Sequence, residues 1–284
     1  MFRRRSLPDG RGSVSRVSQT RNRERERAGG LWETMKYVLM AAAIVAVGCS
    51  QQPKKEETKT APPVEYFHVD PATAASVSGK ITYHGPKPSR KVISMDADAK
   101  CEAANGNKPV YNEPILTGKD SGLANAFVYV QAGLEGKKFE PPKEKVLLDQ
   151  RGCMFVPHVV GIQAAQPLDV KNSDNVGHNI RPMPKNNAAW SDEQAPGAVD
   201  TVHKFARTEV MIPVKCNVHE WMHSWIGVVE NPYFAVTGPD GAFELKNLPP
   251  GDYTIAVWHE TLGTQANQVH VAASQPVAID FSYQ

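Results

Sequence analysis

One short stretch of the chain, residues 209–229, holds a high density of side chains that bind soft metal ions. Cys216 is followed three residues later by His219 and six residues later by Met222. A thiolate, an imidazole and a weak thioether are donors that select copper over harder metal ions. One tight loop can turn all three towards a common centre, so the spacing predicts a mononuclear copper site.

A trigonal copper site of this kind needs a second imidazole, which must come from another segment. His178 follows a polar turn at residues 171–177, and we predict that it completes the ligand set. Two more histidines are possible donors. His223 directly follows Met222 and leaves the axial position open between the two, whereas a surface position suffices to explain His158.

Two other interpretations of these residues stay open. Zinc also accepts one cysteine and two histidines, and a buried free cysteine among surface histidines needs no metal. The thioether of Met222 favours copper over zinc, because soft ligands select copper. The number of donors on one loop favours a metal site over an unliganded thiol.

The segments that must position these donors are short β-branched or aromatic runs separated by glycine and proline. No segment has the i, i+3, i+4, i+7 apolar spacing of a long helix, so the predicted fold class is all-β, built as β-sandwiches. Short helical turns are expected only in the polar, alanine-rich residues 185–205. The expected strands lie at residues 77–83, 92–94, 127–130, 146–148, 154–156, 159–162, 168–170, 210–214 and 225–229.

The order of these elements resembles the cupredoxins, in particular the plastocyanin and amicyanin group. The shared pattern over residues 145–230 is a Phe-x-Pro strand, then Asn-x-Asp-x-x-x-His-Asn, then a short Cys-x-x-His-x-x-Met loop of the amicyanin kind. The resemblance implies a Greek-key copper domain at residues 143–232. It also implies copper on four side chains and a bracing contact from the Asn179 side chain to the cysteine-bearing loop. The four implied ligands are His178, Cys216, His219 and Met222.

The last fifty residues carry a different pattern. Residues 234–245 are predicted to form a hairpin around a Pro-Asp-Gly turn, and residues 248–257 add another turn and strand. The Thr-x-x-Asp-Gly-x-Phe and Leu-Pro-Pro-Gly-x-Tyr motifs resemble the carboxypeptidase regulatory-like domain, a transthyretin-like sandwich. The resemblance implies that this domain is split between residues 76–142 and 233–284, with the copper domain inserted. Two domains in series is the alternative.

The start of the chain reads as a targeting segment. Residues 1–34 are arginine-rich without apolar periodicity, so we interpret them as a mis-called start or a dispensable extension. Residues 35–48 have the basic start and short apolar run of a signal peptide. Gly48 before Cys49 resembles the lipobox of bacterial lipoproteins, which implies a lipid on Cys49, a tether at residues 49–75 and a place in the cell envelope. An ordinary signal peptide is the alternative.

Export also bears on the remaining cysteines and on the choice of function. Cys101 and Cys153 are expected to pair in a disulfide, which is the default in an exported chain. The chain without its basic leader is mildly acidic and has no basic patch for nucleic acid.

The sequence contains no hydrolase, nucleotide-binding or zinc-protease signature. A full set of metal ligands would also leave no open position for a substrate, so the protein is not expected to be an enzyme.

One-electron transfer with an unknown redox protein is therefore the expected function. Copper capture, storage or delivery at the cell envelope is the alternative. Trp221 and Trp225 flank the ligand loop and are interpreted either as an apolar docking patch near His219 or as core packing.

Overall fold

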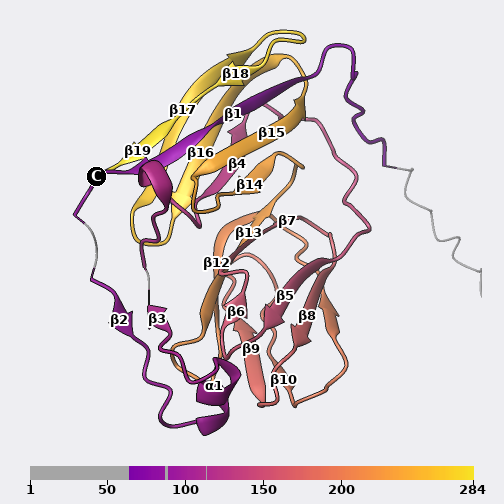
Figure 1. The fold of residues 1–284 in the computed structure, drawn as a ribbon. Helices are drawn as coiled ribbons and strands as arrows, with labels where there is room; N and C mark the ends of the chain where they lie inside the picture. The colour runs from indigo at the N-terminus through magenta and orange to yellow at the C-terminus, as the bar shows by residue number, and fades with distance from the viewer. Residues whose placement is uncertain (1–63, 87–88, 113) are drawn as a thin grey trace, which may run out of the picture. The chain divides into compact units, whose positions relative to one another are not determined.

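The computed structural model describes residues 64–86, 89–112 and 114–284, and Figure 1 shows how their elements are arranged. The predicted all-β fold class is confirmed, because strands dominate; the described residues include one short helix, α1 (Ala99–Ala104), and one 3-10 turn at Lys119–Ser121. The strands are β1 (Ala75–Tyr83), β2 (Lys91–Val92), β3 (Tyr111–Asn112), β4 (Phe127–Ala132), β5 (Val146–Gln150), β6 (Phe155–Val156), β7 (Val159–Gln163), β8 (Leu168–Asn172), β9 (His178–Pro182), β10 (Asp192–Gln194), β11 (Thr201–His203), β12 (Glu209–Lys215), β13 (His223–Val229), β14 (Phe234–Val236), β15 (Ala242–Leu248), β16 (Gly251–His259), β17 (Gly263–Val271), β18 (Val277–Ala278) and β19 (Phe281–Tyr283).

Strands from the beginning and the end of the described chain share one apolar core. One sheet contains β15, β1 and β18, with β19 also paired to β1, and the other has the order β14-β4-β16-β17. Side chains alternate between the two faces of a strand, and the inward ones are buried here. They include Val77, Ile81, Val128, Leu245, Ile255 and Phe281.

The strands between β4 and β14 form two further sheets around a second core. Their orders are β10-β9-β12-β13-β7 and β11-β8-β5-β6. Buried members of this core include Leu148, Ile162, Val170, Ile180 and Ile226, and both Cys216 and Met222 belong to it. The division into a split domain with an inserted copper domain stays a prediction, as does the transthyretin-like resemblance.

A third, smaller apolar cluster joins residues of β4, β7, β13 and β16. Its buried members are Phe127, Tyr129, Val159, Val229 and Ala256. Two glycines allow the Phe127 ring to approach the backbone of β7 and β13. A Cβ atom at Gly161 or Gly227 would lie only 2.7 or 2.6 Å from that ring, so neither position has room for a side chain.

Some sequence-based expectations about local structure are wrong. Residues 234–245 are not a hairpin, because β14 pairs with β4 while β15 pairs with β1 in the other sheet. The Pro-Asp-Gly turn instead carries the chain from one sheet to the other, where long partner strands satisfy both segments. Residues 185–205 contain β10 and β11 and no helical turn.

The segment between β2 and β3 packs into a different core from the one that the predicted domain boundaries imply. The sequence assigns it to the first sandwich, yet Met95 and Cys101 belong to the second core. Helix α1 lies in this segment and was not predicted. Asp98 caps the helix by accepting a 2.9 Å hydrogen bond from the Lys100 N–H, which satisfies a backbone group that the helix leaves free.

Several predictions fall wholly or partly outside the described residues. The extension at 1–34, the signal peptide at 35–48 and Cys49 all do. Part of the predicted tether contacts the connection between β4 and β5. The Phe67 N–H donates to the Lys138 carbonyl at 2.6 Å, and its ring meets Phe139 edge-on. No helix of the described ranges is long and apolar enough to cross a membrane.

Cys101 of α1 and Cys153 form a disulfide, with their Cα atoms 5.5 Å apart. This is the pair expected from the sequence, and Cys216 is the free cysteine of the described residues. The Asn105 side chain reinforces the link by donating to the Gly152 carbonyl at 2.8 Å. The disulfide therefore holds α1 against the turn before β6.

We expect the metal-free Cys101→Ser/Cys153→Ser variant to lose about 4 kcal/mol of unfolding free energy, because the bridge closes a loop of 52 residues. Denaturant unfolding of the variant and of the wild type measures the difference. Wild-type protein with the disulfide reduced is the control and should resemble the variant. Equal midpoints for the variant and the oxidised wild type would contradict this prediction.

Candidate metal centre

The loop between β12 and β13 presents three of the four predicted ligands. These strands form an antiparallel hairpin with Lys215 opposite His223. Two backbone hydrogen bonds close its end: the Cys216 N–H donates to the Met222 carbonyl at 3.1 Å, and the Met222 N–H donates to the His219 carbonyl at 3.0 Å. The loop conformation is therefore set by the hairpin before any metal binds.

His178 reaches the same place from β9. This strand pairs with β12, with Lys215 opposite Arg181, so its first residue lies beside the loop. The preceding turn is held by Asn172, whose side chain donates to the Val176 carbonyl at 2.8 Å and accepts from the Asp174 N–H at 3.0 Å. This polar turn explains why the chain bends sharply before the histidine.

Three of the predicted ligands converge inside the second core. The Nδ1 atoms of His178 and His219 lie 3.1 Å apart, and the Cys216 Sγ lies 3.9 Å from the His219 Nδ1. The exposed fractions of these residues are 2%, 3% and 5%. Met222 is fully buried in the same core and hydrogen-bonded to Cys216 through its carbonyl oxygen. The sequence-predicted residues thus lie together in one buried place.

The surroundings of the Cys216 sulfur favour a thiolate. Backbone N–H groups of Asn179, Val218 and His219 each lie 3.4 Å from Sγ. Burial opposes ionisation, but the His178 imidazole and these N–H groups outweigh it and lower the pKa of Cys216 to about 6. The thiolate is the form of cysteine that binds metals.

Asp174 is a functional residue that the sequence analysis did not single out. Its carboxylate lies 2.9 Å from His178 Nε2 and accepts the backbone N–H groups of Gly152 and Cys153 at 2.7 and 2.8 Å. Burial disfavours the imidazolium, yet Asp174 and the Cys216 thiolate raise the pKa of His178 to about 9. A carboxylate on the outer nitrogen leaves Nδ1 free to bind a metal. Its position four residues before a predicted ligand is the signal that could have revealed it.

The far side of His219 is covered by other side chains. Its Nε2 lies 3.4 Å from the Asp98 carboxylate and 3.6 Å from the Cys101 sulfur. Trp221 lies against its ring, with centroids 5.0 Å apart, and donates its indole N–H to the Cys153 carbonyl at 3.0 Å. Trp225 instead packs against Trp258 in the third cluster.

Asn179 contacts the cysteine in a different way from the one expected. The resemblance implied that its side chain braces the loop. In the structure its backbone N–H points at the Cys216 sulfur, while its side-chain amide donates to Ser191 and to the Asp192 carbonyl at 3.0 Å each. The side chain therefore anchors the beginning of β10.

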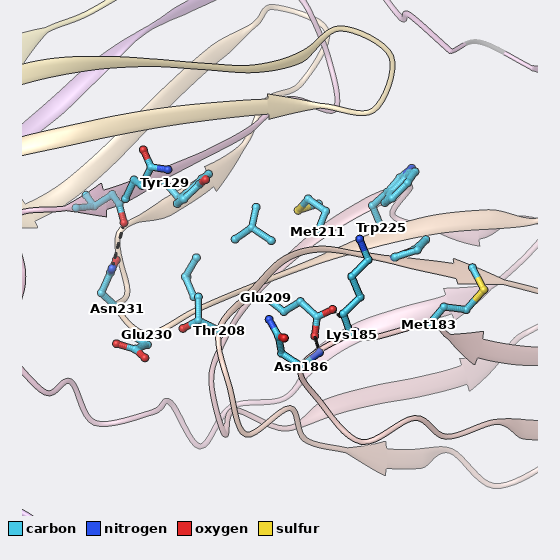
Figure 2. A pocket seen from close by; sticks show the side chains of 15 residues that line it. Tyr129, Met183, Lys185, Asn186, Thr208, Glu209, Met211, Trp225, Glu230 and Asn231 are labelled. Carbon is cyan, nitrogen blue, oxygen red and sulfur yellow. Dashed lines mark hydrogen bonds between the residues drawn. The ribbon is translucent and has the colours of Figure 1, made fainter.

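The donor set fits copper. One thiolate and two imidazoles, with a thioether in the same core, combine soft and intermediate donors. His178, Cys216, His219 and Met222 would hold the ion. None of them lines the cavity of about 750 Å³ in Figure 2, where Glu209 accepts from the backbone N–H groups of Lys185 and Asn186. The centre is therefore a buried ligand cage separate from that cavity.

Comparisons with known proteins find similar solved structures only. No family model matches the chain, and no curated protein does. Among solved structures, the chain is similar to a copper-containing nitrite reductase from Thermus scotoductus (18% identity, 34% of this chain and 24% of that one, TM-score 0.29). It is also similar to a purple cupredoxin from Nitrosopumilus maritimus (16%, 30% and 97%, 0.25) and to a reduced variant of amicyanin (13%, 37% and 98%, 0.28). The matched segment spans about a quarter of the nitrite reductase. The choice of metal rests on the donor atoms and not on these similarities.

We expect metal affinity to rise about tenfold per pH unit between pH 6 and pH 9. In this window Cys216 is already a thiolate and His178 still carries a proton, so each bound metal ion displaces one proton. Below pH 6 the protons on both Cys216 and His178 compete with the metal ion, and above pH 9 neither residue holds a competing proton. Competition titrations with a chelator at several pH values measure this slope.

The Asp174→Asn variant tests whether the proton on His178 causes this pH dependence. Without the carboxylate, His178 holds its proton less tightly, so the rise in affinity should level off at a lower pH. The affinity above pH 9, where no proton competes in the wild type, should fall about 10–100-fold. Asp252→Asn is the control, because that carboxylate pairs with the exposed His270 elsewhere. A slope that is unchanged by Asp174→Asn would contradict this account of the proton.

Proposed function

We propose that this protein transfers single electrons through one copper ion held by His178, Cys216, His219 and Met222. The observation that carries the proposal is the convergence of two imidazole Nδ1 atoms and one cysteine sulfur in a buried core. Bound copper supplies a one-electron Cu(II)/Cu(I) couple. No covalent chemistry on a substrate is then required of the protein.

The chain supports electron transfer by keeping its ligands still. Backbone hydrogen bonds fix the loop from Cys216 to Met222, and Asp174 fixes the ring of His178. A site whose side chains are already placed reorganises little when the charge on the metal changes. The N–H groups around Sγ stabilise negative charge there and would tune the reduction potential.

Burial favours electron transfer over copper capture or delivery. The two histidines and the cysteine are at most 5% exposed, so a partner that received the ion would have to open the loop. An electron can leave without such movement. Trp221 is half-buried and touches His219, so the surface at Trp221 and Asp98 is our proposed contact for the redox partner. No open ligand position supports catalysis here, and we propose that the protein is not an enzyme.

We further propose attachment to the bacterial cell envelope through a lipid on Cys49, from the apolar run and Gly48-Cys49 sequence. Mass spectrometry of the native protein should find a chain that begins at a lipid-modified Cys49. An unmodified Cys49, or cleavage elsewhere, would refute this.

The Met222→Leu variant should retain copper and the strong colour of thiolate-to-copper charge transfer. Two imidazoles and a thiolate provide most of the binding, and an apolar axial side chain favours Cu(I), so the reduction potential should rise. His178→Ala should weaken binding sharply and lose the colour. Visible and EPR spectra, voltammetry and competition titrations measure these effects.

Copper storage would give different results. In that case Met222 is an equal partner for Cu(I), and its removal greatly reduces Cu(I) affinity without leaving a reversible redox wave. Met154→Leu, a substitution of a partly buried methionine outside the proposed ligand set, is the matched control. A colourless Cu(II) protein would reject the thiolate site itself.

A further inference from the structure

A second group of metal-binding side chains lies outside the proposed copper ligands. His158 precedes β7, His223 begins β13 and Glu260 follows β16. One ligand atom from each lies within 4.8 Å of the others. Strands β7 and β13 are parallel neighbours, with Val159 opposite Trp225, so both histidines lie at the same end of adjacent strands.

The Glu260 carboxylate lies close to both histidines. Its side chain is only 13% exposed, and its Oε1 lies 2.7 Å from His158 Nε2. Its Oε2 accepts the indole N–H of Trp225 at 2.7 Å and lies 3.7 Å from His223 Nε2. The Trp225 hydrogen bond fixes the carboxylate, and the longer distance to His223 is beyond a hydrogen bond.

His223 is oriented as a metal ligand. Its Nδ1 lies 3.0 Å from the Trp221 carbonyl oxygen. A carbonyl can only accept, so Nδ1 carries a proton. In the neutral ring the lone pair that a metal needs is therefore on Nε2, which lies 3.7 Å from Glu260 Oε2. A backbone carbonyl on the outer nitrogen is how proteins commonly orient a ligating imidazole. The rings of His158 and His223 are nearly perpendicular, with centroids 5.0 Å apart.

We propose that His158, His223 and Glu260 form a second metal site, which takes a divalent first-row transition ion such as Zn²⁺, Co²⁺ or Cu²⁺. Two imidazoles and one carboxylate suit these ions, and three protein ligands leave a position for water. Small side-chain movements bring the three atoms to ligand distance. The site does not share a residue with the proposed copper ligands, and the inference does not rest on the proposed function.

The site would join two parts of the fold. His158 precedes and His223 begins a strand of the second core, whereas Glu260 follows a strand of the first. The ion would therefore clamp the contact that Trp225 and Trp258 already make. Because His223 is next to Met222, occupancy would also restrain the loop that carries the proposed copper ligands.

Cobalt titration of the full-length Cys216→Ala variant tests the proposal. This variant lacks the thiolate of the first site, so a sulfur-to-cobalt charge-transfer band cannot arise there. We expect one equivalent of Co²⁺ to bind, with weak d–d bands only. Adding His158→Ala should weaken that binding at least about 100-fold. His270→Ala is the control, because that histidine is exposed and pairs with Asp252.

Glu260→Gln gives a second, milder test, because glutamine keeps the shape and can still accept from Trp225. It should also weaken Co²⁺ binding, whereas circular dichroism should show an intact fold. If no Co²⁺ binds to Cys216→Ala, or if neither substitution changes its affinity, the group is an ion pair only and the proposal is wrong. Failure of the copper proposal would appear separately, as a wild-type Cu(II) protein without a charge-transfer band.

Discussion

The central constraint in this structure is a charged group of side chains inside an apolar core. A thiolate and an imidazolium at Cys216 and His178 lose most of their hydration, which is costly unless other groups replace the water. Asp174 and the backbone N–H groups around Sγ do so. Since two of the Asp174 hydrogen bonds come from Gly152 and Cys153, the turn beside the disulfide is part of the same network. The disulfide and α1 therefore support the charged group as well as the fold.

Two consecutive residues of the hairpin of β12 and β13, Met222 and His223, face different surroundings. Met222 is fully buried in the second core, whereas His223 is partly exposed beside Glu260. Successive side chains at the beginning of a strand point to opposite sides. A single short segment can therefore supply a soft donor to a buried cage and a harder donor to a surface group. This explains why the histidine next to Met222 need not compete for the axial position.

The sequence predicted the parts of the fold that depend on local pattern. The all-β class and the grouping of His178, Cys216 and His219 follow from strand periodicity and donor spacing. The partners of β14 and β15 could not be predicted, because a Pro-Asp-Gly turn suits a hairpin and also a crossing between sheets. Helix α1 was missed because six residues carry too little periodicity to be recognised. The role of Glu260 depends on a strand pairing that brings residues 158 and 260 together, which no local pattern contains.

The cover over His219 has a consequence for how electrons would travel. It comes from the long connection between β1 and β4, which the Cys101–Cys153 disulfide ties to the turn before β6. The Trp221 indole N–H, which donates to the Cys153 carbonyl, links that turn to the ligand loop. This connection places a carboxylate and a sulfur against the outer edge of the imidazole. Negative charge from Asp98 near that edge would favour the more positive oxidation state of a bound ion, because opposite charges attract. The Asp98 side chain is 29% exposed, so water screens part of this attraction. In the proposed copper site, the same segment would limit access to the ion and influence its reduction potential, although it supplies none of the proposed ligands.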